Sequence, residues 1–361
     1  AQKKALMPDH HVVVVGASAG GVESLQALVS SLPPDLNAAI FVVLHISPNY
    51  VSHLPDILSR RGPFPATHPA GRELIRAGRI YVAPPDHHLL IEGEHVVATR
   101  GPKENRNRPS IDALFRSAAY HYRDRAIGIV LSGALDDGTS GLWNIKRMGG
   151  IAITQDVAEC AFDSMPSSAL AQVDVDFSLS ASGMGQLLDR LVQESAQMSR
   201  KDTPQVQRQG DPDSLIGLEV DIAIGDQALE KGMVTLAPPS PFACPECHGV
   251  MMEIREGKRT RYRCHTGHAY STSALLSELM ENVDQSYWKA MRGLEEAAML
   301  LGKASEELRE SNRHDAAELF RQESERTRQQ AEKIREIVLS SKRYSGDSLV
   351  EKAEQEPGNQ D

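Results

Sequence analysis

The sequence has no apolar run long enough to cross a membrane. Its longest run, residues 38–44, is far shorter than the roughly 20 residues that a transmembrane helix needs. The first eleven residues also lack the apolar core of a secretory signal. Basic residues are not in excess, because the net charge is −10, which disfavours nucleic acid and anionic membrane surfaces as partners. We therefore expect a cytoplasmic protein that neither inserts into a membrane nor binds nucleic acid.

Cysteine is also scarce, with 4 in 361 residues. Three of the four fall in a metal-like spacing instead of spreading along the chain as disulfide staples would. This pattern agrees with a reducing compartment. An apolar content of 40% and a charged content of 24% are typical of a globular protein, and the length allows about two domains.

A glycine-rich turn near the N-terminus surrounds one serine. The valine run at residues 12–15 ends in Gly16-Ala17-Ser18-Ala19-Gly20, and a helical pattern begins at once. This Gly-x-Ser-x-Gly order is typical of an elbow that exposes a nucleophilic serine at the start of a helix. Taken alone, the pattern fits a nucleophile, a phosphate-binding loop or a structural turn.

Strand-like and helix-like patterns alternate through the first half of the chain. Buried-strand runs occur at residues 12–15, 39–44 and 126–131, and helical patterns separate them. Residues 89–91 and 95–98 are expected to pair as a hairpin. The alternation predicts an α/β fold with a doubly wound, mostly parallel, Rossmann-like sheet that helices cover on both faces.

Each of the three apolar runs is followed by a residue capable of chemistry. Ser18, His45 and Asp137 come just after these runs. The carboxyl ends of parallel strands meet at one edge of the sheet, so a nucleophile, a base and an orienting carboxylate would converge there. Singly, His45 could be an ordinary strand-end histidine and Asp137 a helix cap. Their occurrence together at three strand ends favours a catalytic site.

Two other α/β site types fit the sequence poorly. A dinucleotide fingerprint needs glycine where Ser18 stands and an acidic residue near the position that His45 occupies, and no Gly-Lys-Ser/Thr motif follows the turn. An ordinary α/β-hydrolase runs Ser, acid, His along the chain, whereas the order here is Ser18, His45, Asp137.

A set of short motifs in this order identifies a family. The motifs are Gly16-Ala17-Ser18-Ala19-Gly20-Gly21, Leu44-His45, Arg108-Pro109-Ser110-Ile111-Asp112, Ser132-Gly133 with Asp136-Asp137-Gly138, and Ser164-Met165-Pro166. Residues 11–195 thus resemble the catalytic domain of CheB-type chemotaxis receptor methylesterases. The resemblance implies hydrolysis of glutamate γ-methyl esters on methyl-accepting chemotaxis receptors, with release of methanol, and deamidation of receptor glutamines in some members. It implies that Ser18 is the nucleophile, that His45 is the general base and acid, and that Asp137 orients His45.

An oxyanion hole is expected beside the serine. Its donors would be the Ala19 N–H and an N–H of the Gly133-Ala134 turn. By resemblance, Met165 lines the substrate cleft, although the same segment also fits a simple helix start. The family commonly has threonine at Ala19 and Gly-Met-Gly at residues 133–135, so any side-chain role at these places is lost here.

The usual family member has a receiver domain before the catalytic domain, and none precedes residue 11 in this sequence. Either the protein is regulated differently or the residues shown lack an upstream part. Receptors, and other chemosensory signalling proteins, are the expected partners. The alternative hypothesis is a non-catalytic regulatory or scaffold protein on the same fold that acts through its C-terminal module.

A candidate metal site follows an expected linker at residues 196–235. In the module at residues 236–273, the spacing of Cys244, Cys247 and Cys264 with a nearby histidine is typical of a structural Zn²⁺ site. Either His265 or His268 can be the fourth ligand, and His268 is preferred because it leaves a longer loop and resembles modules appended to some methylesterase relatives. A bound zinc, worth on the order of 10 kcal/mol, would stabilise so short a module. Four protein ligands leave no open position, so we expect no cofactor for catalysis.

The end of the chain has a helical period. Residues 274–342 are expected to form either a helical hairpin or a dimerising coiled coil, and the coiled coil would make a homo-oligomer. Residues 343–361 are expected to be a disordered tail. The apolar stripe of the first helix comprises Leu276, Met280, Val283, Tyr287, Met291, Leu294, Ala298 and Leu301.

Two histidine pairs show no chemical pattern around them. His10, His11, His87 and His88 are expected at the surface.

Overall fold

The computed structural model describes residues 10–198, 212–225 and 237–340. The chain divides into two compact units, Ala1–Ala274 and Leu275–Asp361. Within the described ranges, no helix combines the length and apolar character that a bilayer crossing requires. The predicted tail at residues 343–361, and much of the predicted linker, lie outside the described residues.

A seven-stranded parallel sheet organises the first unit, in the order β10-β9-β8-β1-β2-β5-β3. The strands are β1 (His11–Ala17), β2 (Ala38–Leu44), β3 (Ala66–Thr67), β5 (Ile80–Val82), β8 (Ala126–Val130), β9 (Ile151–Gln155) and β10 (Phe177–Leu179). The central strands β1 and β2 are buried along their whole length, as expected for valine-rich strands of a covered parallel sheet. From β1 the chain adds β2 and β5 on one side of the sheet, and later β8, β9 and β10 on the other side. Open α/β sheets bind ligands at such a switch point, which here lies between β1 and β8.

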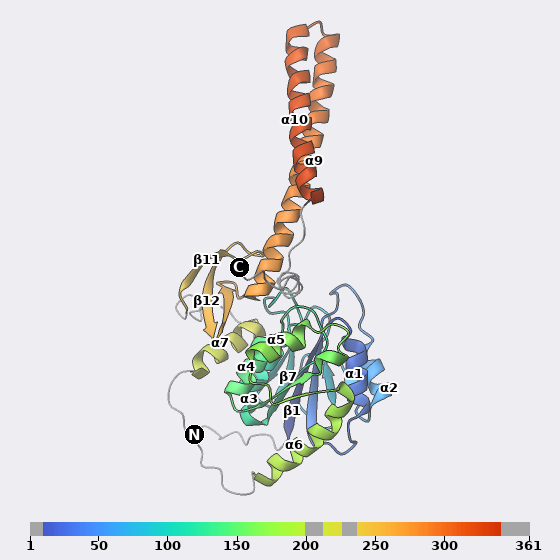
Figure 1. Ribbon diagram of the computed structural model, residues 1–361, viewed down its shortest axis with the longest axis vertical. Coiled ribbons are helices and arrows are strands. Elements are labelled where there is room, and N and C mark those ends of the chain that lie inside the picture. The colour runs from blue at the N-terminus through green and yellow to red at the C-terminus, as the bar shows by residue number, and fades with distance from the viewer. Residues whose placement is uncertain (1–9, 199–211, 226–236, 341–361) are drawn as a thin grey trace, which may run out of the picture. The chain divides into compact units, whose positions relative to one another are not determined.

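Helices cover both faces of this sheet (Figure 1). They are α1 (Gly21–Ser30), α2 (Leu54–Arg61), α3 (Ile111–Tyr122), α4 (Thr139–Arg147), α5 (Ser164–Gln172) and α6 (Met184–Met198). Alternate valines of β1 belong to opposite cores: Val13 shares a buried cluster with Leu25 of α1. Val14 shares the other cluster with Phe115 of α3. The prediction of a doubly wound, Rossmann-like α/β fold is confirmed.

A smaller antiparallel sheet, in the order β4-β7-β6, lies beside helix α3. Its strands are β4 (Arg72–Leu74), β6 (His88–Glu92) and β7 (His95–Thr99), so residues 89–91 and 95–98 pair as predicted. Helix α7 (Pro212–Ile224) falls within the expected linker but packs against this part of the fold. Ile222 is buried, and the Thr99 hydroxyl donates to the Ala223 carbonyl at 2.7 Å. These residues are therefore structural and are not a solvated connection.

Four antiparallel strands complete the first unit. They are β11 (Pro239–Ala243), β12 (Val250–Glu256), β13 (Arg259–Cys264) and β14 (Ala269–Ser271), in that order across the sheet. This sheet belongs to the same compact unit as the parallel sheet.

Two long helices, α9 (Thr272–Glu310) and α10 (His314–Ser340), follow. In the second unit the Ser305 hydroxyl donates to the Ala317 carbonyl, and the Ser324 hydroxyl to the Ala298 carbonyl, both at 2.7 Å. The two helices therefore pair within one chain as a hairpin. An oligomer formed through them stays a prediction.

The hairpin seam uses smaller side chains than the predicted stripe. Of that stripe only Met291 and Ala298 are buried, whereas Leu276 and Val283 are exposed. Close packing at Ala298 and Ala317 lets serine hydroxyls reach carbonyls of the facing helix.

Candidate active site and metal centre

Ser18 lies in the turn between β1 and α1, half-buried at the carboxyl edge of the sheet. Its N–H donates to the Ser132 carbonyl at 3.0 Å, and its carbonyl accepts from the Gly21 N–H at 2.9 Å. Gly20 precedes the helix with a φ of 69°, a left-handed conformation that suits glycine. A Cβ added to Gly133 would lie 2.8 Å from the Ser18 Cβ, so the loop after β8 approaches the serine closely.

His45 stands next to Ser18 because β1 and β2 pair in register. Ala17 is opposite Leu44, so Ser18 and His45 directly follow paired residues of neighbouring strands. The backbone N–H of His45 also donates to the Ala17 carbonyl at 3.1 Å. On the ring, Nε2 lies 2.8 Å from Asp137 Oδ2, and the side chain is only 13% exposed. The three residues predicted from strand ends are therefore brought to one edge.

Asp137 is held by many donors. Its carboxylate accepts from the first amides of α3, Ile111 N at 2.8 Å and Asp112 N at 3.1 Å. The Ser110 hydroxyl donates at 3.0 Å and Asn105 Nδ2 at 2.9 Å. Asp137 thus takes the capping role at the N-terminus of α3, where a carboxylate is favoured by the free amides and the helix dipole. Ser110 has the N-cap position but makes no side-chain cap to the helix.

Burial and charge act in opposite directions on two neighbouring carboxyls. Burial alone would raise the pKa of Asp137, but the hydrogen bonds from His45 and Asn105 outweigh it and hold that pKa below its ordinary value. Burial and the nearby charge of Asp137 raise the pKa of Asp112 to about 7. At neutral pH Asp137 is therefore ionised, which is the state that can orient an imidazole.

Of the predicted oxyanion residues, Ala19 follows Ser18 in the chain, and Ala134 and Met165 lie beside Gly133, which approaches the serine closely. The Gly133 N–H already donates to the Phe162 carbonyl at 2.9 Å, so Ala134 carries the N–H of this turn that remains a candidate. Met165 is fully buried, and its sulfur lies 2.1 Å from where a Cβ on Gly133 would be. Met165 therefore packs against the loop that contains Gly133. Ala19, half-buried, follows Ser18 in the turn, and its carbonyl accepts from the Ser132 hydroxyl at 2.9 Å.

The expectation of surface histidines is wrong at two positions. His11 is 7% exposed and His88 is fully buried. His88 accepts from Ser110 N at Nδ1 and contacts the Pro102 carbonyl through Nε2 at 2.8 Å, which requires a neutral ring. Burial lowers the pKa of His88 accordingly.

Three thiols and one imidazole gather in the β11–β14 module. The ligand atoms of Cys244, Cys247, Cys264 and His268 all lie within 4.8 Å of one another. His268 Nδ1 lies 3.6 Å from the sulfurs of Cys244 and Cys264, and the Cys247 and Cys264 sulfurs are 3.5 Å apart. A tetrahedral zinc with Zn–S bonds of about 2.3 Å requires ligand separations of this size. The donor set therefore fits Zn²⁺, with His268 and not His265 in the cluster.

A carboxylate behind the imidazole completes the cluster. His268 Nε2 lies 3.3 Å from Glu246 Oε2, and the Tyr270 hydroxyl donates to Glu246 Oε1 at 3.2 Å. Metal-binding histidines commonly donate their second ring nitrogen to such a group, which fixes the tautomer. Glu246 was not predicted from the sequence, although its place inside the Cys244-Pro245-Glu246-Cys247 turn was a signal.

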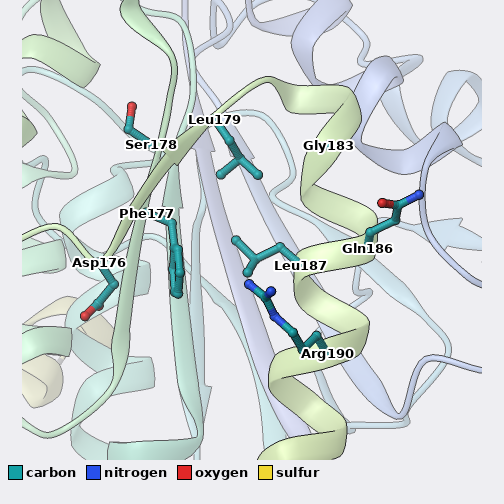
Figure 2. A pocket seen from close by; sticks show the side chains of 8 residues that line it. All are labelled: Asp176, Phe177, Ser178, Leu179, Gly183, Gln186, Leu187 and Arg190. Atoms are coloured by element: carbon teal, nitrogen blue, oxygen red, sulfur yellow. The ribbon is translucent and has the colours of Figure 1, made fainter.

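A groove of about 650 Å³ lies elsewhere, at the β10 edge of the sheet. Figure 2 shows its lining side chains, which come from around β10 and α6 and include Phe177, Leu187 and Arg190. None of the predicted site residues lines it, and its Asp176 is engaged with Lys146 at 2.7 Å. It carries no part of the candidate site.

Comparisons with known proteins show which family the chain resembles. A family model described as CheB methylesterase matches residues 13–188. A putative protein-glutamate methylesterase/protein-glutamine glutaminase of Leptospira interrogans is 36% identical over 186 residues, which cover 51% of this chain and 96% of that relative. Proteins with this name from Methanosarcina mazei and Anaeromyxobacter dehalogenans are 33% and 38% identical, over 50% and 46% of this chain.

The matched segment is about half of this chain and about half of the last two relatives, at 52% and 49% of their lengths. A solved structure, the catalytic domain of Thermotoga maritima CheB methylesterase, is 30% identical, with a TM-score of 0.49 over 51% of this chain and 99% of that one. The family match ends at residue 188, before the β11–β14 module. The Leptospira relative and the family model together show that the chain belongs to the CheB methylesterase family.

Proposed function

We propose that this protein is a protein-glutamate methylesterase that hydrolyses glutamate γ-methyl esters on methyl-accepting chemotaxis receptors in the cytoplasm. The observation that carries the proposal is the 2.8 Å contact between His45 and Asp137, beside Ser18 on a register-paired strand end. The names of the relatives, which pair methylesterase with glutaminase, support the substrate class and add glutamine deamidation as a second activity. Other chemosensory proteins are further partners in this proposal.

The proton transfers follow from the ring geometry. Because Asp137 engages Nε2 of His45, Nδ1 is the nitrogen that accepts the Ser18 proton as the hydroxyl attacks the ester carbonyl. The imidazolium then gives this proton to the departing methoxide, and methanol leaves an acyl-serine. Water attacks the acyl group by the same route in reverse, which restores Ser18 and releases the glutamate carboxylate.

The negative oxygen of each tetrahedral intermediate needs donors close to Ser18. The N–H groups of Ala19 and Ala134 are the proposed pair, since the Gly133 N–H is already taken by the Phe162 carbonyl. One such donor is worth roughly 10² to 10³ in rate. Backbone donors do not depend on the side chains in which this sequence departs from its family.

The test is methanol release from a methylated receptor fragment by the full chain. Ser18→Ala should lower the rate by about 10⁴-fold or more, because the nucleophile is lost while receptor binding is kept. Ser178→Ala, at an exposed position on β10, is the matched control and should retain the wild-type rate. Wild-type protein that releases no methanol from receptor shown to be methylated would contradict the proposal and favour the non-catalytic scaffold hypothesis.

We also infer that the Cys₃His cluster binds one structural Zn²⁺. Cys244, Cys247, Cys264 and His268 would hold the ion, which supplies folding energy and no catalytic step. Cys264→Ser should abolish stoichiometric zinc in elemental analysis of the purified chain. Cys160→Ser, at the cysteine outside the cluster, should keep it. Wild-type chain that is folded but metal-free after purification with zinc present would refute the site.

A further inference from the structure

The β11–β14 module contacts the catalytic part through buried ion pairs. Glu104, which precedes α3, lies 2.8 Å from Arg116 of α3 and 2.8 Å from Arg263 of β13. All three side chains are at most 1% exposed. Because a buried charge that loses its partner is strongly destabilising, this contact fixes the module against α3.

A second carboxylate joins helix α7 to the same cluster. Glu219 lies 3.0 Å from Arg261 and 3.0 Å from Arg263. Arg261 also contacts Glu256 at 2.5 Å, and Glu256 accepts from the Ser140 hydroxyl of α4 at 2.6 Å. The three glutamates, 104, 219 and 256, balance the three arginines, 116, 261 and 263, so the cluster is neutral although it is buried.

The module also reaches the residue next to the catalytic carboxylate. Asp136, which directly precedes Asp137, accepts from Arg259 Nη2 at 3.0 Å and from the Ser271 hydroxyl at 2.7 Å. Both donors belong to the module. The backbone that carries Asp137 is therefore held from the module side.

Asn105 connects strand β14 with the catalytic carboxylate. Its N–H donates to the Ala269 carbonyl, and its Oδ1 accepts from Ser271 N, both at 2.8 Å. Its Nδ2 donates to Asp112 Oδ2 at 2.8 Å and to Asp137 Oδ1 at 2.9 Å. The residue is 4% exposed. Its backbone has a φ of 48°, which asparagine, aspartate and glycine tolerate best.

We propose that Asn105 is a positioning residue for the His45–Asp137 pair and that strand β14 of the metal-binding module holds it in place. The orientation of the Asn105 amide is fixed, because its Oδ1 accepts a hydrogen bond from Ser271 N. The two hydrogens of Nδ2 therefore point at the carboxylates of Asp112 and Asp137. These hydrogens separate Asp112 from Asp137, which would otherwise repel each other. The module is thus a part of the catalytic centre, and this inference rests on the proposed function of Ser18, His45 and Asp137.

The first test measures activation of Ser18 without any receptor. A fluorophosphonate is attacked by an activated serine oxygen at phosphorus, with loss of fluoride and transfer of the serine proton to the base. The labelling rate is followed by intact mass. Asn105→Gly and Asn105→Asp both tolerate the left-handed backbone, so they change the side chain alone. Each should slow labelling on the order of 10²-fold, as expected for a misplaced catalytic group.

The pH profile separates positioning from general damage. Without the Asn105 donor, Asp137 holds the proton on the imidazole more strongly, so the acid limb of labelling should move to higher pH. In Asn105→Asp the added negative charge should move it further. With receptor substrate, kcat should fall while KM stays within about twofold, because Asn105 is buried. Thr272→Ala, whose hydroxyl donates only to the Thr260 carbonyl, is the module-side control and should match the wild type.

Each outcome decides the inference. Wild-type labelling rates in both variants would overturn it, and so would slower labelling with an unmoved acid limb. For the role of β14, Cys264→Ser should lose metal by elemental analysis and shift the acid limb in the same direction. Loss of metal with wild-type labelling would overturn that role. Wild-type chain that is labelled at Ser18 but releases no methanol would contradict the proposed substrate and leave this inference standing.

Discussion

Leu135 adopts a backbone conformation that glycine prefers. Its φ is 64°, and it lies between Gly133, which approaches Ser18, and Asp137, which contacts His45. An L-residue in this region costs about 1–2 kcal/mol because its Cβ approaches the carbonyl. The sequence already differed here from the Gly-Met-Gly pattern of the family, and the structure shows that the backbone keeps the glycine-like shape despite the leucine.

A pair of substitutions isolates this strain. Leu135→Gly and Leu135→Ala both remove most of the half-buried side chain, but only glycine relieves the left-handed conformation. We expect the glycine variant to be more stable than the alanine variant by about 1 kcal/mol in denaturant unfolding. An alanine variant at least as stable as the glycine variant would show that the loop carries no such strain.

At the residue scale, the sequence predicted the groups that end buried strands and missed those that support them. Ser18, His45 and Asp137 follow apolar runs whose ends must meet in a parallel sheet. Asn105 follows no such run, and its partners lie up to 166 positions away along the chain. A hydrogen bond between residues so far apart in the sequence leaves no periodic pattern, so it can be found only in the structure.

At the scale of elements, helix α7 differs most from the expectation. Two acidic residues, Glu219 and Asp221, interrupt the apolar residues 215–224, so the sequence does not show that this helix is buried on one side. Glu219 is 1% exposed and is neutralised by Arg261 and Arg263, which follow it by more than 40 residues. Charged residues are rarely buried without such partners, and the partners could not be assigned from sequence.

Removing this carboxylate should weaken the whole first unit. Glu219→Ala leaves Arg116, Arg261 and Arg263 close together with one counter-charge fewer, and we expect a loss of about 3–5 kcal/mol in the free energy of unfolding. Denaturant unfolding followed by near-ultraviolet circular dichroism measures it. Glu94→Ala, at an exposed turn, should change stability by less than about 0.5 kcal/mol. Equal effects of the two changes would mean that the buried cluster does not stabilise the unit.

At the scale of the molecule, the two units depend on charge in different ways. The first unit has a buried group of ion pairs, such as Arg116 with Glu104, besides exposed ones, whereas the ion pairs described in the second unit, such as Glu318 with Arg321, lie at the surface. Exposed pairs contribute little to stability and are screened by salt. The helical period predicted a hairpin or a dimerising coiled coil without deciding between them. It did not show that the β11–β14 sheet belongs to the same unit as the parallel sheet, since that contact is made by buried charges.

Acid should therefore unfold the two units separately. Although burial alone would raise their pKa values, the surrounding arginines hold the pKa of Glu104 far below its usual range and that of Glu219 at about 2. A depressed folded pKa contributes stability above the unfolded value of about 4.3, and this stability is lost as pH falls toward the folded values. Between about pH 4.3 and pH 2 the first unit should lose its structure while the hairpin keeps its helices.

The two tryptophans give one reporter for each unit. Trp143 belongs to α4 of the first unit, and Trp288 belongs to α9 in the second. In Trp288→Phe the remaining fluorescence should change through this acid range, whereas in Trp143→Phe it should change at lower pH or not at all. Because exposed carboxylates contribute little to the hairpin, their protonation removes little of its stability. A single shared midpoint for both variants would contradict the separation and would show that the units unfold as one.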